Sequence, residues 1–145
     1  EINASFGIYQ IQKIEQFNFH RKFLAEKFYK NLSNLNNLKG PTVEKDCEPC
    51  FMSLPIKIIN SEYTNAKAIK FLEERGVESR PLIAGNIINH PVSKIFNFSS
   101  TQENLEGANY HHKNSFYVGL SSKHTSKDID RLSLVMKDLD KVLNS

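Results

Sequence analysis

Apolar residues recur at spacings of three, four and seven along the first part of the chain, and these are the spacings of an α-helix. The stripe consists of Ala4, Ile8, Ile11, Ile14, Phe17, Leu24, Phe28 and Leu32. No proline interrupts residues 1–40. The pattern predicts one long helix over residues 2–35, bent or broken near Phe17 and Asn18. Such a helix has one apolar face that other structure must cover.

Three later segments have the composition of β-strands. They cover residues 51–59, 77–83 and 115–120 and are rich in β-branched and aromatic residues. Pro55 lies inside the first of them, which favours an edge position or a bulge because proline cannot donate to a sheet.

Helical patterns alternate with these strands. The first of them follows Thr64 and is closed by Gly76 in the position after a helix, where glycine is favoured. A short helix is expected over residues 101–112, after an irregular apolar segment that begins at His90. The last helix follows Thr125, which has capping-box spacing to Asp128. The order predicts an α+β fold, a small and mostly antiparallel sheet backed by helices.

Composition excludes several classes of protein. At 145 residues with 39% hydrophobic residues, the chain is long and apolar enough to form one folded domain, so disorder is excluded. The net charge of +3 is too small to indicate nucleic acid or an anionic membrane as a partner. No apolar run approaches the length of a bilayer span. Two cysteines and no signal peptide indicate a cytoplasmic setting.

The cysteine and histidine pairs are weak candidates for metal binding. Cys47 and Cys50 form a single CxxC pair, whereas a structural zinc site needs four ligands, so the interpretation is two incidental thiols in a turn. His111 and His112 are adjacent on a helix, so they point about 100° apart and do not easily share an ion. One is expected inward and the other exposed. We expect His20 and His124 (two isolated histidines) to be solvated at the surface.

The stretch from Arg80 to Asn86 is the most informative for function. Arg80 lies on a strand that leads into a loop of small residues, and it suits a carboxylate or a phosphate. Gly85 permits a positive φ or a close approach, and Asn86 offers donors and an acceptor for sugar hydroxyls or carbonyls. The alternative is a surface ion pair beside a simple turn. The sequence contains no complete catalytic set, so the residues alone favour binding, positioning or dimerisation.

Four segments, in order, resemble the C-terminal part of the DegT/DnrJ/StrS family of pyridoxal-phosphate-dependent enzymes, which act on nucleotide-linked keto-sugars. They are residues 1–11 (EINASFGIYQI), 71–81 (FLEERGVESRP), 114–119 (NSFYVG) and 126–130 (SKDID). Together they span nearly the whole chain. The resemblance implies a long linking helix at residues 1–40 and the small C-terminal α+β domain of a fold-type I enzyme at residues 41–145.

The same resemblance implies that the cofactor lies elsewhere. In the family, a large preceding domain holds pyridoxal phosphate and the lysine that binds it. The helical pattern is already under way at Glu1, without an initiator Met, so we expect a fragment that binds no cofactor or metal and is inactive alone. The helix over residues 2–35 would expose the apolar side chains that the large domain covers, which predicts a homodimer.

A finer resemblance concerns the turn Ala84-Gly85-Asn86 and the sequence that follows it. It is similar to the branch that removes the 3-hydroxyl of 4-keto-6-deoxy sugars in deoxysugar and lipopolysaccharide O-antigen biosynthesis. In that branch a histidine replaces the cofactor lysine, at a position outside this chain. A sugar aminotransferase of the same family is the alternative, and a stand-alone dimerisation or ligand-binding module is the second.

The implied substrate-binding residues are Arg80, Gly85, Asn86 and Phe116, on the side that faces the nucleotide sugar. For Phe116, packing in the core is the competing interpretation and the stronger one.

Overall fold

The computed structural model describes residues 2–59, 62–83, 85–96 and 105–144. Its elements, in chain order, are α1 (Ile2–Ile11), α2 (Ile14–Leu32), β1 (Leu38–Lys39), β2 (Ser53–Ile58), α3 (Asn65–Glu73), β3 (Ser79–Pro81), the 3₁₀ helices η1 (Ile87–Asn89) and η2 (Pro91–Lys94), α4 (Glu106–Asn114), β4 (Ser115–Gly119) and α5 (Ser126–Leu143). The α+β class expected from the sequence is confirmed.

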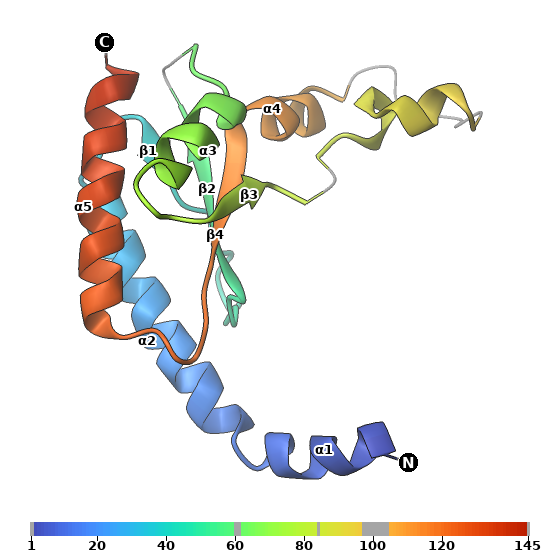
Figure 1. Ribbon diagram of the computed structural model, residues 1–145, viewed down its shortest axis with the longest axis vertical. Coiled ribbons are helices and arrows are strands. Elements are labelled where there is room, and N and C mark those ends of the chain that lie inside the picture. The colour runs from blue at the N-terminus through green and yellow to red at the C-terminus, as the bar shows by residue number, and fades with distance from the viewer. Residues whose placement is uncertain (1, 60–61, 84, 97–104, 145) are drawn as a thin grey trace.

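The N-terminal helical region is two helices, which corrects the prediction of one helix over residues 2–35. The break falls at Gln12 and Lys13, before the expected place, and α2 ends at Leu32. The Lys13 N–H donates to the Gln10 carbonyl at 3.0 Å, three residues back, so the helical ladder tightens and stops there. In Figure 1, α1 turns away from α2 and leaves the body of the molecule.

The sheet has four strands in the order β1-β2-β4-β3, and every neighbouring pair is antiparallel. Burial alternates along β2, so one face of the sheet forms the core and the other is partly solvated. The core face carries Leu54, Ile56, Ile58, Phe116 and Val118. The predicted strands are confirmed but shorter than expected, and β1 is a strand that the sequence analysis missed.

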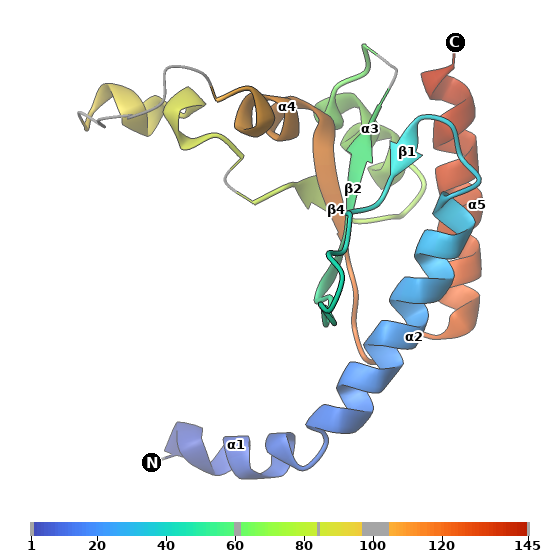
Figure 2. The ribbon, with the colours of Figure 1, turned by 180° about the vertical axis from the view of Figure 1, so that it is seen from behind.

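Helices α2, α3 and α5 supply most of the remaining core residues. Figures 1 and 2 show α2 and α5 side by side along one side of the sheet. Their buried residues include Leu24, Phe28, Leu72, Ile129 and Met136. The predicted capping box at the start of α5 is present: the Thr125 hydroxyl accepts from the Asp128 N–H, and the Asp128 carboxylate accepts from the Thr125 N–H. The C-terminal helix is therefore fixed at its first turn.

Pro55 lies on β2, which is an inner strand, but at a position where no residue of β1 pairs with it. The Leu120 N–H donates to the Met52 carbonyl, so these two opposite residues form a hydrogen-bonded pair. Hydrogen-bonded and non-hydrogen-bonded pairs alternate along an antiparallel ladder, so the pair of Pro55 and Tyr117 is not hydrogen-bonded. The backbone N and carbonyl of Pro55 therefore face away from β4. On that side β1 pairs only with Lys57 and Ile58. The expectation of an edge position therefore holds locally. The Tyr29 hydroxyl donates to the Pro55 carbonyl at 3.3 Å, and burial raises the pKa of Tyr29.

The segments around β3 are joined by two glycine turns. Gly76 closes α3 as predicted: its φ is +72°, its N–H donates to the Glu73 carbonyl, and the Val77 N–H donates to the Leu72 carbonyl. After β3, a second turn leads to η1 and then to η2, and only η2 lies in the predicted irregular segment, which begins at His90. The helix expected over residues 101–112 is α4, and residues 101–104 lie outside the described part of the chain.

Candidate functional site

A cavity of about 580 Å³ opens beside β3, between the turn at Gly76, the end of β4 and the first half of α5. Its apolar lining includes Leu54, Val118, Leu120, Ile129 and Leu132, which belong to the core. Small-molecule sites are commonly of this volume, with an apolar lining and a few polar groups. The cavity therefore makes this edge of the sheet a candidate site.

The rim of the cavity carries charge of both signs. Arg80 donates to the Glu78 carboxylate at 2.8 Å, and both side chains are exposed. The hydrogen bond and charge of Glu78 raise the pKa of Arg80. Arg131 adds a second cation, while Asp128 is engaged by the cap of α5. An exposed ion pair such as Arg80–Glu78 contributes little to stability, so Arg80 can change partner at low cost.

Ser79 adds a polar group to the lining of the same cavity. It begins β3 and is 5% exposed. Its Oγ is buried without a hydrogen-bond partner within the described structure. A buried hydroxyl in that state is unfavourable, so the hydroxyl of Ser79 is a polar group able to bind a ligand in the cavity.

The structure places Gly85 and Asn86 against α4. Gly85 has a φ of +54°, and a Cβ built on it would lie 2.5 Å from the Nδ1 of His112, closer than two such atoms can pack. The expectation of a positive φ and a close approach at this glycine is thus confirmed. Ala84, the first residue of the predicted turn, lies outside the described residues.

Asn86 is 5% exposed, and both ends of its amide are engaged within the protein. Its Oδ1 accepts from the Ile88 N–H at 3.1 Å and caps η1, and its Nδ2 donates to the Oδ1 of Asn109 at 2.8 Å. Its backbone N–H donates to the Nδ1 of His112 at 3.3 Å. In this conformation the amide organises the turn, and its contact with a sugar stays a prediction.

Phe116 and Arg80 lie on neighbouring strands but point to opposite faces of the sheet. Phe116 is 0% exposed and pairs with Pro81, while Arg80 pairs with Tyr117. The ring of Phe116 therefore lies in the core, as the competing interpretation has it. The four predicted residues therefore lie in three places. Arg80 lies at the cavity, Gly85 and Asn86 form the turn that contacts α4, and Phe116 lies in the core.

The histidines differ partly from expectation. As predicted, His111 is exposed and His112 is half-buried. His20 and His124, expected to be solvated, instead contact each other: the Nε2 of His20 lies 2.8 Å from the carbonyl of His124. The contact ties α2 to the loop before α5, and the large separation of the two residues in sequence hid it.

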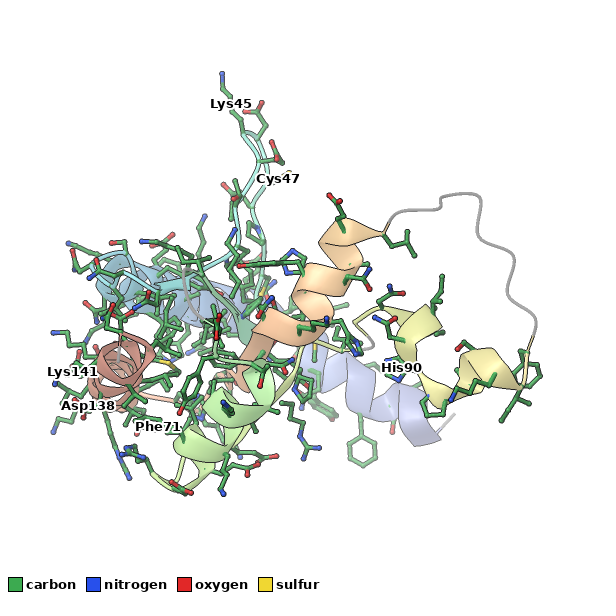
Figure 3. The ribbon with its side chains drawn as sticks, turned by 90° about the horizontal axis from the view of Figure 1, so that it is seen from above. Lys45, Cys47, Phe71, His90, Asp138 and Lys141 are labelled. Atoms are coloured by element: carbon green, nitrogen blue, oxygen red, sulfur yellow. The ribbon has the colours of Figure 1, made fainter. Side chains whose placement is uncertain are left out.

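Cys47 and Cys50 are free and exposed in the loop between β1 and β2. Figure 3 shows Cys47 near the tip of this loop, which projects from the body of the molecule. Among the described residues, no three His, Cys, Asp or Glu side chains gather as a metal site would require. In the same part of the chain, every helix is too short or too polar to span a bilayer.

Two residues that the sequence analysis missed belong to this region. Tyr117 lines the cavity beside Arg80, and Asn109 binds Asn86 and Asn89 through one oxygen. Alternation along β4 could have indicated Tyr117. Asn109 lies three positions before His112 on the same helix, a spacing that places both on one face and could have drawn attention to it.

Comparison with known proteins establishes the family. The family profile described as the DegT/DnrJ/EryC1/StrS aminotransferase family matches residues 1–137. The chain belongs to this family. The resemblance seen in the four sequence segments is thereby confirmed.

Curated relatives of this family member carry 3-dehydratase names. The GDP-4-keto-6-deoxy-D-mannose 3-dehydratase of Escherichia coli O55:H7 is 28% identical over 94% of this chain and 35% of its own length. The dTDP-4-dehydro-2,6-dideoxy-D-glucose 3-dehydratase of Saccharopolyspora spinosa is 26% identical over 90% of this chain and 28% of its own length. The chain thus spans about a third of the length of these relatives.

Solved structures agree with this assignment. The structure of GDP-4-keto-6-deoxymannose-3-dehydratase with bound GDP-perosamine matches 89% of this chain and 33% of that one, with a TM-score of 0.78 and 27% identity. An Escherichia coli enzyme of that name with bound hydrated PLP has a TM-score of 0.77 at 27% identity, over 89% of this chain and 33% of that one. An aminotransferase from Streptoalloteichus hindustanus has a TM-score of 0.79 over 98% of this chain and 37% of that one, but at 19% identity it shows the fold alone.

Proposed function

We propose that the chain is the C-terminal part of a pyridoxal-phosphate-dependent enzyme that removes the 3-hydroxyl of a nucleotide-linked 4-keto-6-deoxy sugar. The observation that carries the proposal is the match of nine-tenths of the chain to relatives named as 3-dehydratases. A similar relative named as a lipopolysaccharide biosynthesis protein in Salmonella typhimurium, at 24% identity over 90% of this chain and 30% of its own length, supports a role in making surface sugars.

Arg80 is the residue of this chain best suited to the nucleotide. Its guanidinium stands exposed at the cavity rim and is held by a single exposed carboxylate, that of Glu78. A diphosphate can accept two parallel hydrogen bonds from an arginine, a stronger arrangement than an exposed ion pair. In the proposal, Arg80 exchanges Glu78 for a phosphate when substrate binds, while Gly85 and Asn86 shape the neighbouring turn.

The resemblance places the residue that holds pyridoxal phosphate, a lysine or in the dehydratase branch a histidine, in the preceding domain. The described lining of the cavity beside β3 has no lysine, and its histidine, His124, accepts the Ser121 N–H at Nδ1. In the proposal the cofactor is therefore held outside the described part of the chain, where it would supply the electron sink for proton removal beside the keto group. This chain contributes the substrate side of the site.

We also infer that residues 1–40 link the domain at residues 41–145 to a larger one, and that the enzyme is a cytoplasmic homodimer. The support for the link and for the homodimer is the exposed apolar face of the N-terminal helices. Phe6 and Tyr9 are each 68% exposed, and Ile8 and Ile11 are nearly as open. Exposed apolar patches of this kind are typical of surfaces that pack against protein.

The test starts from the coding sequence that surrounds the codon for Glu1. The encoded protein is purified with pyridoxal phosphate and incubated with an amino donor and GDP-4-keto-6-deoxymannose. The masses of the products are measured by mass spectrometry. A 3-deoxy sugar, with a histidine at the cofactor position, supports the proposal. A 4-amino sugar, with a lysine there, supports the alternative that the family description names, an aminotransferase. No reaction with any nucleotide sugar overturns both.

A further inference from the structure

The 3₁₀ helices η1 and η2 form an arm that extends away from the sheet (Figures 1 and 2). Three hydrogen bonds tie the base of this arm to α4. His112 accepts one from the backbone of Asn86, and the Oδ1 of Asn109 accepts one each from the side chains of Asn86 and Asn89, both at 2.8 Å. We call these residues, together with Gly85, the clasp.

The α4 half of the clasp is itself fixed to the core. The carbonyl of His112 accepts from the Nδ2 of Asn65 at 2.9 Å, and the same amide donates to the carbonyl of Ser115 at 3.0 Å. Asn65 is buried and begins α3. Asn109 and His112 lie three positions apart and therefore share one face of α4. The clasp thus connects a projecting arm to the rigid part of the molecule.

The ring of His112 makes two contacts, a hydrogen bond and a contact with another ring. Its Nδ1 accepts the Asn86 N–H, so this nitrogen carries no proton of its own. The ring of His90 packs against it edge-on, with centroids 5.4 Å apart and an interplanar angle of 81°. Figure 3 labels His90, which lies within the arm between η1 and η2.

The backbone near the clasp is held in an unfavourable conformation. Ile83 has a φ of +36°, which is rare for a β-branched residue. Its side chain is 86% exposed, so burial does not compensate for the strain. Gly85 follows at +54°, where His112 leaves no room for a Cβ. Strained residues persist where the surrounding structure determines them, and they concentrate at functional sites.

We propose that Asn109 and His112 are positioning residues that hold the Gly85–Asn86 turn, and with it the arm, in the orientation that the nucleotide sugar meets. This inference rests on the proposed function. It gives Asn86 a defined task in which it acts through the turn, and it makes α4 a part of the substrate site without direct contact to the ligand.

The clasp is tested by amide hydrogen exchange in this chain, measured by NMR. The His112→Leu variant removes the acceptor and should speed exchange at the Asn86 amide about two- to tenfold, the range for loss of one hydrogen bond. His112→Asn puts an oxygen close to the place of Nδ1 and should restore most of the protection. The matched control is His111→Leu, which changes the exposed neighbour and should leave the Asn86 amide unchanged.

A second variant covers the case in which His112→Leu does not fold. Asn109→Ala removes the acceptor of two hydrogen bonds on a half-buried helical position, and alanine favours the helix. It should speed exchange at the Ile88 amide, which depends on the position of Asn86. Unchanged exchange at both amides in the folded variants would overturn the clasp, whatever the activity.

The positioning role is tested in the complete enzyme with GDP-4-keto-6-deoxymannose. His112→Leu should raise KM more than it lowers kcat, and His112→Asn should return KM toward the wild-type value. Faster exchange with an unchanged KM overturns the positioning role and leaves the proposed function intact. A wild-type enzyme without activity overturns the proposed function and the role toward the sugar together, and the exchange data then still decide the clasp by themselves.

Discussion

The two turns that flank β3 each contain a glycine at positive φ, but their surroundings differ. At Gly76, φ is +72° and the nearest atom to an added Cβ would be a guanidinium nitrogen of Arg131, 3.9 Å away. At Gly85, φ is +54° and an added Cβ would meet the ring and backbone of His112 at 2.5–3.1 Å. One glycine ends a helix by local geometry, and the other is required by a neighbour from a distant part of the sequence.

This difference shows which residues determine the backbone geometry of each turn. The turn at Gly76 is closed by hydrogen bonds within eight residues of chain, so its geometry follows from its own sequence. The turn at Gly85 takes its geometry from α4, and a change on α4 therefore alters it. Substitutions at the two glycines should separate the two cases.

The largest effect is expected for Gly85→Ala. The substitution combines a positive φ with a clash against His112, and overpacking costs about 1–3 kcal/mol beyond the backbone strain. We expect a loss of about 2–4 kcal/mol, taken either from global stability or as local opening of the arm. Urea unfolding measures the first and amide exchange at Asn86 the second, and no change in either would contradict the close contact.

Gly76→Ala is the matched control and should cost less. Alanine meets the same restriction on positive φ but finds open space, so the loss of unfolding free energy should be about 1 kcal/mol. The measurement is again a urea unfolding curve. A cost equal to that of Gly85→Ala would show that the contact with His112 adds nothing.

Ile83→Asn should change stability in the opposite direction. Asparagine tolerates a positive φ better than a β-branched residue, so relief of strain should raise the unfolding free energy by about 0.5–1 kcal/mol. The control is Ile95→Asn, at a similarly exposed isoleucine with a φ of −93°, which should bring no gain. Equal effects of the two substitutions on the urea midpoint would remove the argument for strain at Ile83.

The smallest effect on stability is expected at the start of α5, where Thr125 and Asp128 form the capping box. Hydrogen bonds from the backbone and hydroxyl of Thr125 lower the pKa of Asp128 in the folded protein. A lowered pKa stabilises the fold above the unfolded value of about 3.9, and this contribution is lost as the pH falls through the folded value. Urea midpoints of the wild type and Asp128→Asn, measured from pH 7 to pH 3, should converge toward low pH, and a gap that stays constant over this range would contradict the stabilising role of the Asp128 carboxylate.

The sequence predicted the elements whose signals are local. The capping box at Thr125, the helix stop at Gly76 and the alternation in β2 and β4 are all decided within a few residues. The position of Arg80 at an accessible strand follows from the same kind of signal. Local residue chemistry was therefore sufficient for most of the fold and for one member of the candidate site.

The sequence could not predict features that depend on residues far apart in the chain. The break at Lys13 leaves an apolar stripe that continues across it, so periodicity alone gave one helix. The strand β1 exists only because Leu38 and Lys39 pair with β2. Likewise, the bonds between Asn86 and α4 join residues 23 or more positions apart. Their geometry is set by tertiary packing.

The open stretch of β2 at Pro55 has a consequence for how copies of this chain meet. A strand edge with free donors and acceptors recruits strands from other molecules and so leads to fibrils. Here proline has no N–H to offer, and its carbonyl is already bound by the Tyr29 hydroxyl. This stretch of β2 is therefore not expected to recruit a strand from another copy of the chain.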